Sequence, residues 1–141
     1  VNLTILKYFE IEMSYMWLSN MKEYSLYPFK ETIYKYETEI LRRPKHSFKS
    51  SIFFENENTI LGISFRYTST RKDMVYNLPK TPYATTLEPY FLTNIYAAYK
   101  PVKEIKLFGR VENLFNVDYS EVYGYTAHGL SFFIGVQYEG F

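Results

Sequence analysis

The sequence predicts an all-β fold, an antiparallel up-and-down meander of about six strands. Hydrophobic and polar residues alternate with a period of two in several runs of about ten residues. Long and short connections alternate strictly between these runs. Aromatic residues make up 21% of the 141 residues, and cysteine is absent. Many tyrosines without cysteine suit strands whose ends lie at a membrane interface, where amphipathic rings settle.

The first run, residues 3–19, predicts one long strand. Glu10 and Glu12 stand between Phe9, Ile11 and Met13, so the two-residue period fits better than a helix, which the Leu, Glu and Met content also allows. The alternation is lost over residues 20–45, which predict a long exposed loop. Residues 31–41 in this loop are able to form a short extra strand.

The next two runs, residues 46–55 and 61–68, predict a hairpin. They are separated by Asn56-Glu57-Asn58, residue types that tolerate a left-handed backbone. Residues 71–89 contain three prolines and no period, so they predict a second long loop without regular structure.

Three further strands complete the meander. They are predicted over residues 90–99, 105–112 and 131–138, joined by a short turn at 100–104 and a third long connection at about 115–130. Short turns at one end and long loops at the other are typical of bacterial outer-membrane barrels. Strands of about ten residues suit a tilted crossing of the hydrocarbon layer.

The alternation divides the strand residues between two faces. One face is predicted to meet a wet lumen because it carries bulky charges in mid-strand: Glu10, Glu12, Lys49, Arg66, Arg110 and Glu112. The other is apolar and predicted to meet lipid: Leu61, Ile63, Phe65, Tyr67, Phe132, Ile134, Val136 and Tyr138. By pattern alone, a soluble sheet with its apolar face on a core is about equally compatible. Long loops leave little chain to cover that face, which favours the membrane alternative.

Residues 111–119 read VENLFNVDY, and VYGY follows at 122–125 before a glycine and the last strand. This order resembles the C-terminal end of TonB-dependent outer-membrane receptors. Residues 41–46, LRRPKH, resemble the segment that opens a late barrel strand in the same family. The resemblance implies that residues 1–141 are the C-terminal part of a transmembrane β-barrel of about 22 strands, with the plug domain absent. It also implies a cell outer-membrane location and uptake of ferric siderophores or cobalamin.

The partners implied by this resemblance are outer-membrane lipid, the remainder of the barrel, the plug, TonB through a missing N-terminal part, and the barrel-assembly machinery. A net charge of +1 gives no argument for nucleic acid. His46 and His128 are the two histidines, without metal-ligand spacing, and no catalytic arrangement or phosphate loop occurs. We therefore expect no enzyme activity, no metal and no cofactor.

Two groups of residues are candidates for specific roles. Tyr76, Tyr83, Tyr123 and Tyr125, with Tyr119, are loop tyrosines that offer rigid contact area for a ligand, although an interfacial girdle or packing within the loops explains any one of them. Gly135, Tyr138 and Phe141 follow the plan of a barrel-assembly signal. The signal is imperfect because Phe141 comes one residue late, and a bulge at Gly140 would restore its facing. A frayed tail is the alternative.

The chain contains no run of eighteen apolar residues, which excludes a transmembrane helix. It also begins at Val1 without a signal peptide, so we expect a piece of a longer protein. The alternatives to a receptor are a soluble lipocalin-like binding module with an apolar ligand and a porin-type barrel without energy coupling.

Overall fold

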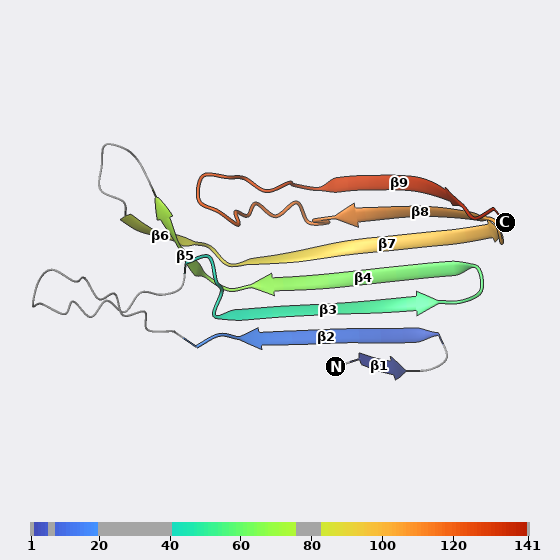
Figure 1. Ribbon diagram of the computed structural model, residues 1–141, viewed down its shortest axis with the longest axis horizontal. Helices are drawn as coiled ribbons and strands as arrows, with labels where there is room; N and C mark the ends of the chain where they lie inside the picture. The colour runs from blue at the N-terminus through green and yellow to red at the C-terminus, as the bar shows by residue number, and fades with distance from the viewer. Residues whose placement is uncertain (1, 6–7, 20–40, 76–82, 141) are drawn as a thin grey trace, which may run out of the picture.

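The computed structural model describes residues 2–5, 8–19, 41–75 and 83–140. Its main sheet has seven antiparallel strands in the order β1-β2-β3-β4-β7-β8-β9 (Figure 1). A separate two-stranded sheet pairs β5 with β6. The strands are β1 (Asn2–Ile5), β2 (Phe9–Trp17), β3 (His46–Glu55), β4 (Thr59–Thr68), β5 (Arg71–Val75), β6 (Tyr83–Leu87), β7 (Tyr90–Val102), β8 (Ile105–Glu112) and β9 (Ser131–Tyr138).

The predicted antiparallel meander is confirmed, and β3, β8 and β9 have the predicted bounds, whereas β4 begins at Thr59, two residues before the predicted Leu61. In the hairpin turn, the Asn56 side-chain oxygen accepts from the backbone N–H groups of Asn58 at 3.0 Å and Thr59 at 2.8 Å. Strand β7 continues to Val102, three residues beyond the prediction, after a register shift between Tyr99 and Val102.

The prediction of one strand over residues 3–19 is wrong. The chain turns at Tyr8, and β1 then pairs antiparallel with β2. The turn lies where the partner strand ends: Phe9 is opposite Phe54, and the Tyr8 carbonyl accepts from the Glu55 N–H at 2.9 Å. Alternation continues through both strands, so the period alone does not locate the reversal.

The prediction that residues 71–89 lack regular structure is also wrong. Strands β5 and β6 form an antiparallel hairpin beyond the ends of β4 and β7, at the left of Figure 1. Arg71, Asp73 and Val75 are buried, whereas Lys72 and Met74 between them are half-buried. Because the buried side of β5 carries charged residues, a search for alternating hydrophobic residues does not detect its two-residue period.

The division into two faces is confirmed by the pairing register, since residues directly opposite one another lie on the same face. Ile11, Ile52, Ile63, Ile95, Val111 and Phe132 form one rung across six adjoining strands. Glu12, Ser51, Ser64 and Asn94 form a rung of the opposite face. We call these the apolar face and the polar face. The predicted lumen-facing charges all lie on the polar face, and the predicted lipid-facing residues all lie on the apolar face.

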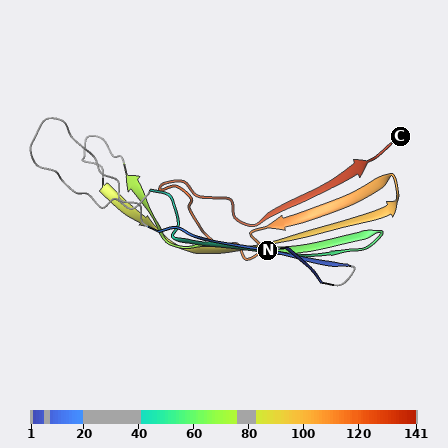
Figure 2. The ribbon, with the colours of Figure 1, turned by 60° about the horizontal axis from the view of Figure 1, so that its bottom comes forward.

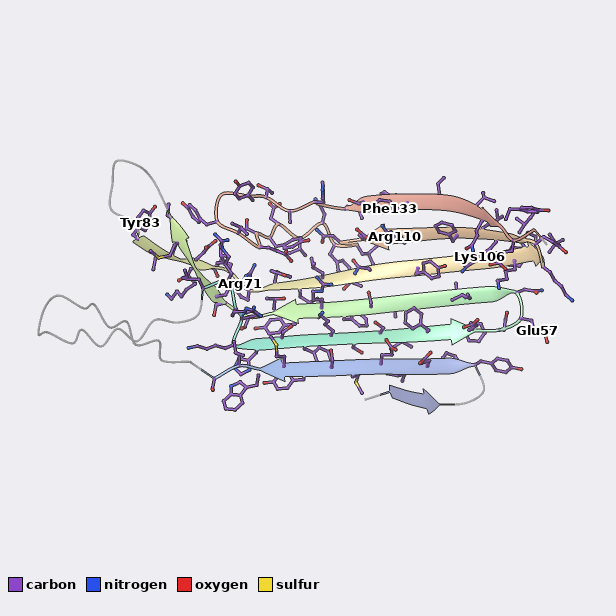
Figure 3. All side chains as sticks on the ribbon, viewed as in Figure 1. Glu57, Arg71, Tyr83, Lys106, Arg110 and Phe133 are labelled. Carbon is purple, nitrogen blue, oxygen red and sulfur yellow. The ribbon has the colours of Figure 1, made fainter. Side chains whose placement is uncertain are left out.

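The polar face also holds aromatic rings that lie against glycines. Phe53 is opposite Gly62, and a Cβ added to Gly62 would lie 2.6 Å from Cε1 of its ring. Phe108 covers Gly135 in the same way. The Arg110 guanidinium lies 4.3 Å from the centre of the Phe133 ring on the neighbouring strand (Figure 3). Arg110 Nε also lies 3.2 Å from Glu112 Oε1.

The apolar face is exposed. Ile134 is 92% exposed, and Leu61, Phe132, Val136 and Tyr138 are exposed as well. The buried apolar side chains of the described residues are instead Val75, Leu87, Tyr90, Leu92 and Ala98. Most of these lie near the loop end, by which we mean the end of the sheet that carries the long connections.

The main sheet is curved and open (Figure 2), and β1 and β9 form its two edges. A lipocalin-like module would require a sheet closed on itself, whereas β1 and β9 are not paired with each other. Strand β9 ends at Tyr138, so Gly140 lies beyond the strand and forms no bulge there. No helix among the described residues is long and apolar enough to cross a membrane. The extra strand expected within 31–41, apart from Leu41 itself, lies outside the described residues.

Candidate ligand-binding site at the loop end

The Asp73 side chain joins three segments that are distant in the sequence. It is fully buried, and its Oδ1 accepts from Arg42 Nε and from the Met74 N–H, both at 2.8 Å. Its Oδ2 accepts from the Tyr123 N–H at 2.7 Å. Burial raises the pKa of the Asp73 carboxyl, but the hydrogen bonds of Tyr123, Arg42 and Met74 together lower it more, so the pKa lies below its ordinary value. Asp73 is therefore ionised at neutral pH.

A second contact group lies beside this one and centres on Tyr90. The Arg71 guanidinium lies 5.2 Å from the centre of the Tyr90 ring, and the centres of the Tyr90 and Tyr119 rings are 4.5 Å apart. Arg71 Nη2 donates to the Ser120 carbonyl, and the Tyr90 hydroxyl donates to Glu121 Oε1 at 3.2 Å. Figure 3 shows Arg71 at the junction between the main sheet and the β5–β6 hairpin. These contacts fasten the loop between β8 and β9 to the end of the sheet.

The asparagines of the N-L-F-N motif shape the start of that loop. Asn113 and Asn116 have φ values of 51° and 50°, a left-handed conformation that asparagine tolerates better than most residues. The Asn113 side chain accepts from the Val117 N–H at 2.8 Å and donates to the Val117 carbonyl at 2.9 Å. Asn116 Oδ1 accepts from the Leu130 N–H at 2.9 Å, which ties the end of the loop to its start.

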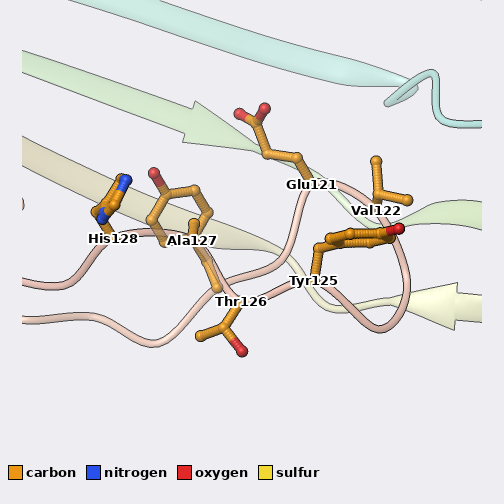
Figure 4. A pocket seen from close by; sticks show the side chains of 7 residues that line it. Glu121, Val122, Tyr125, Thr126, Ala127 and His128 are labelled. Carbon is orange, nitrogen blue, oxygen red and sulfur yellow. The ribbon is translucent and has the colours of Figure 1, made fainter.

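A cavity of about 460 Å³ opens in this loop (Figure 4). Its lining contains two tyrosine rings, one carboxylate and one imidazole, and consists of Tyr119, Glu121, Val122, Tyr125, Thr126, Ala127 and His128. Burial raises the pKa of the Tyr119 phenol, and the Glu121 charge raises it further, so the phenol is protonated at neutral pH. The lining is therefore aromatic with one negative charge.

The predicted loop tyrosines are only partly brought together. Tyr125 and Tyr119 line the cavity, whereas Tyr123 lies beside it and binds Asp73 through its backbone N–H. Tyr83 begins β6, is 49% exposed and does not line the cavity. Tyr76 lies outside the described residues, as does Phe141 of the predicted assembly signal.

Sequence reasoning missed Asp73, Arg71, Arg42 and Glu121 as organising residues of this end. Their partners are 31 to 50 residues away in the sequence, so no local spacing points to them. One signal was present, because Arg71 and Asp73 are two residues apart, as charges on one face of a strand would be. Among the described residues, no group of three or more His, Cys, Asp or Glu side chains is placed to hold a metal ion.

Known proteins that resemble this chain in sequence and in fold are of the same kind. Over 98 residues, the chain is 26% identical to the vitamin B12 transporter BtuB of Vibrio cholerae, a match that covers 70% of this chain and 16% of that protein. The siderophore receptor PiuA of Acinetobacter baumannii superposes with a TM-score of 0.75 at 18% identity, over 97% of this chain and 20% of that one. The resemblance to TonB-dependent outer-membrane receptors is confirmed.

Another outer-membrane receptor of this type has a similar sheet. The ferripyoverdine receptor of Pseudomonas aeruginosa, solved with ferripyoverdine bound, has a TM-score of 0.70 at 13% identity, over 97% of this chain and 18% of that receptor. No family model matches the chain. The predicted outer-membrane location is confirmed by these similarities, and the relatives are transport receptors rather than enzymes. The chain spans about a fifth of the length of these TonB-dependent receptors.

Proposed function

We propose that this chain forms the C-terminal strands of a receptor barrel that takes up a scarce nutrient of the ferric siderophore or cobalamin class. The observation that carries the proposal is the exposed apolar face, which crosses six adjoining strands opposite a charged face. An exposed apolar surface of this extent is unfavourable in water and favourable against lipid. The chain has no catalytic role in this proposal.

In the proposed barrel, the apolar face contacts outer-membrane lipid, and the polar face contacts the lumen and a plug domain. The unpaired edges at β1 and β9 are costly in lipid, because their backbone groups have no partner there. The remainder of the barrel therefore pairs with them, and the 141 residues are not competent for transport alone. Gly135, Tyr138 and Phe141 present the assembly signal to the barrel-assembly machinery.

The loop end is proposed to contribute to ligand recognition outside the cell. A vitamin B12 transporter is similar to this chain in sequence, and a siderophore receptor and a ferric-catecholate import receptor are similar to it in fold. Uptake in the proposed function draws energy from TonB, which engages an N-terminal part of the complete receptor.

The assignment of the faces is tested by spin labels at neighbouring residues of opposite facing. Ile63→Cys and Phe132→Cys place a label on the apolar face, and Ser64→Cys and Ser131→Cys place one on the polar face. In the complete protein in outer-membrane vesicles, the first pair should collide preferentially with dissolved oxygen. The second pair should collide preferentially with a water-soluble nickel complex. Equal accessibility of both pairs to the nickel complex would exclude a lipid-facing wall.

The uptake function is tested in cells that lack the gene for the complete protein. Growth on a limiting ferric siderophore or on cobalamin should require both this gene and TonB. Growth that depends on the gene but persists without TonB would instead indicate a porin-type barrel.

A further inference from the structure

We infer that the cavity in the β8–β9 loop takes a positively charged group, an amine or guanidinium carried on an aromatic or alkyl body. The inference rests on the proposed function, because it assigns a chemical class to one group of the ligand that the receptor would hold. It derives from the charge and the ring content of the cavity lining, which contains no lysine or arginine.

The negative charge of the lining comes from Glu121. Its side chain is exposed, and it forms no ion pair with any of the described residues. The Tyr90 hydroxyl donates to its Oε1 at 3.2 Å. At the Tyr119 hydroxyl, burial is the largest cause of the raised pKa, and the charges of Glu121 and Glu112 add to it while that of Arg66 opposes it. Within the lining itself, the charge of Glu121 favours a cation.

The rings of the lining add a second attraction for a cation. A charged amine or guanidinium within about 6 Å of a tyrosine ring centre is stabilised by the ring quadrupole. Tyr125 is 73% exposed, so its ring is available to a ligand. Tyr119 is fixed against Tyr90 at 4.5 Å, which orders its ring before any ligand arrives.

The nearby arginine does not provide an anion site in this cavity. Arg71 is 6% exposed, lies over the Tyr90 ring and donates through Nη2 to the Ser120 carbonyl, and its Nη1 is buried without a hydrogen-bond partner among the described residues. It is not one of the lining residues. A carboxylate or catecholate group that entered the cavity would meet the Glu121 charge, and the lining itself holds no lysine or arginine.

Three probes with one phenylethyl body test the inference. They are phenylethylammonium, 2-phenylethanol and phenylacetate, which carry a positive, a neutral and a negative group. Saturation-transfer NMR titrations of the complete protein in detergent micelles should give the ammonium a Kd about fivefold lower than that of the alcohol, the size expected of an exposed cation–π contact with a charge nearby. Phenylacetate should bind weakest. Equal or tighter binding of phenylacetate would overturn the inference.

Variants locate the binding at the cavity. Glu121→Gln retains a carbonyl that can accept from Tyr90 but removes the charge, so the preference for ammonium over alcohol should fall to about twofold, the part that the rings supply. Tyr125→Ala should weaken ammonium binding without touching the Glu121 charge. Glu57→Gln is the matched control, because Glu57 is exposed in the short turn at the opposite end of the sheet. An unchanged preference in Glu121→Gln, with β-sheet circular dichroism intact, would refute the assignment.

Failure of this inference is distinguishable from failure of the proposed function. The spin-label accessibilities and the TonB-dependent growth do not depend on what the cavity binds. A receptor that passes both assays but shows no preference for ammonium has the proposed function and a different ligand chemistry at this cavity.

Discussion

The Asp73 carboxylate accepts a hydrogen bond of 2.7 Å from the Tyr123 backbone N–H, fifty residues later in the sequence. Asp73 also binds Arg42, 31 residues before it. One buried side chain thus joins the segment before β3, the β5–β6 hairpin and the loop that carries the cavity. The geometry of the cavity depends on this junction, because Tyr123 lies between two lining residues, Val122 and Tyr125.

Replacing Asp73 by Ala should loosen the loop end. The change leaves two backbone N–H groups and the Arg42 guanidinium without their acceptor, which costs about 2–3 kcal/mol for bonds to a buried charge. Hydrogen–deuterium exchange should speed up at Met74 and Tyr123 and stay unchanged in the centre of β3 and β4. Asp118→Ala, an exposed aspartate of the same loop, is the control. Unchanged exchange at Tyr123 in the Asp73 variant would contradict the role of this junction.

The junction should also respond to acid in a defined direction. The pKa of Asp73 is below its ordinary value of 3.8 in the folded protein, so folding favours the ionised form. Its contribution to stability is fully present above pH 3.8 and is lost as the pH falls through the folded-state pKa. Amide protection at Tyr123, corrected for intrinsic exchange, should therefore hold down to about pH 4 and decline below it. Asp73→Asn should remove this acid dependence, and an identical decline in that variant would assign it to other groups.

The left-handed backbone at Asn113 predicts a difference between two substitutions. Asn113→Ala loses the hydrogen bonds to Val117 and places a Cβ-bearing residue without local polar compensation at φ 51°. Asn113→Gly loses the same bonds but tolerates that conformation, so it should be more stable than the Ala variant by about 1 kcal/mol. Urea unfolding of the complete protein in micelles measures both. Asn58→Ala, in the exposed short turn, serves as control, and equal stability of the Ala and Gly variants would rule out backbone strain.

The aromatic–glycine pair at Phe53 and Gly62 predicts intolerance to a single methyl group. In Gly62→Ala the new Cβ would lie 2.6 Å from the Phe53 ring, so the ring must move, at a cost of about 1–3 kcal/mol. Gly109→Ala is the matched control, because its Cβ would meet the Phe133 carbonyl oxygen at an ordinary 3.5 Å. Phe53→Leu should recover part of the loss in a double-mutant cycle. Equal urea midpoints for the two Ala variants would refute this close contact.

Most of the strands could be predicted from the sequence because each rests on a local pattern. In β9, Phe132, Ile134, Val136 and Tyr138 alternate with Ser131, Phe133, Gly135 and Gln137, so the period alone defines the strand and its faces. The Asn56–Asn58 turn is local as well. The reversal at Tyr8 was missed because alternation runs through it, and only the length of the partner strand decides where β2 begins.

The loop end was predicted only in part, because its contacts join distant residues. Two of its tyrosines, Tyr119 and Tyr125, are expected from residue type, whereas Asp73 and Arg71 lie in a segment that the sequence predicts to be an irregular loop. On β5 the charged residues Arg71 and Asp73 are buried, and burial of a charge is stable only where partners surround it. Those partners come from Arg42, Ser120 and Tyr123, far away in the sequence, so no local pattern contains them.

The sequence by itself determined the strands, their two faces and the resemblance to a receptor barrel, since side-chain alternation and short motifs act over neighbouring residues. Three features depend on the tertiary structure: the β5–β6 hairpin forms, Asp73 joins three segments, and an open cavity lies in the β8–β9 loop. Each of these depends on desolvated polar contacts between distant residues, whose strength comes from mutual burial rather than from any one segment.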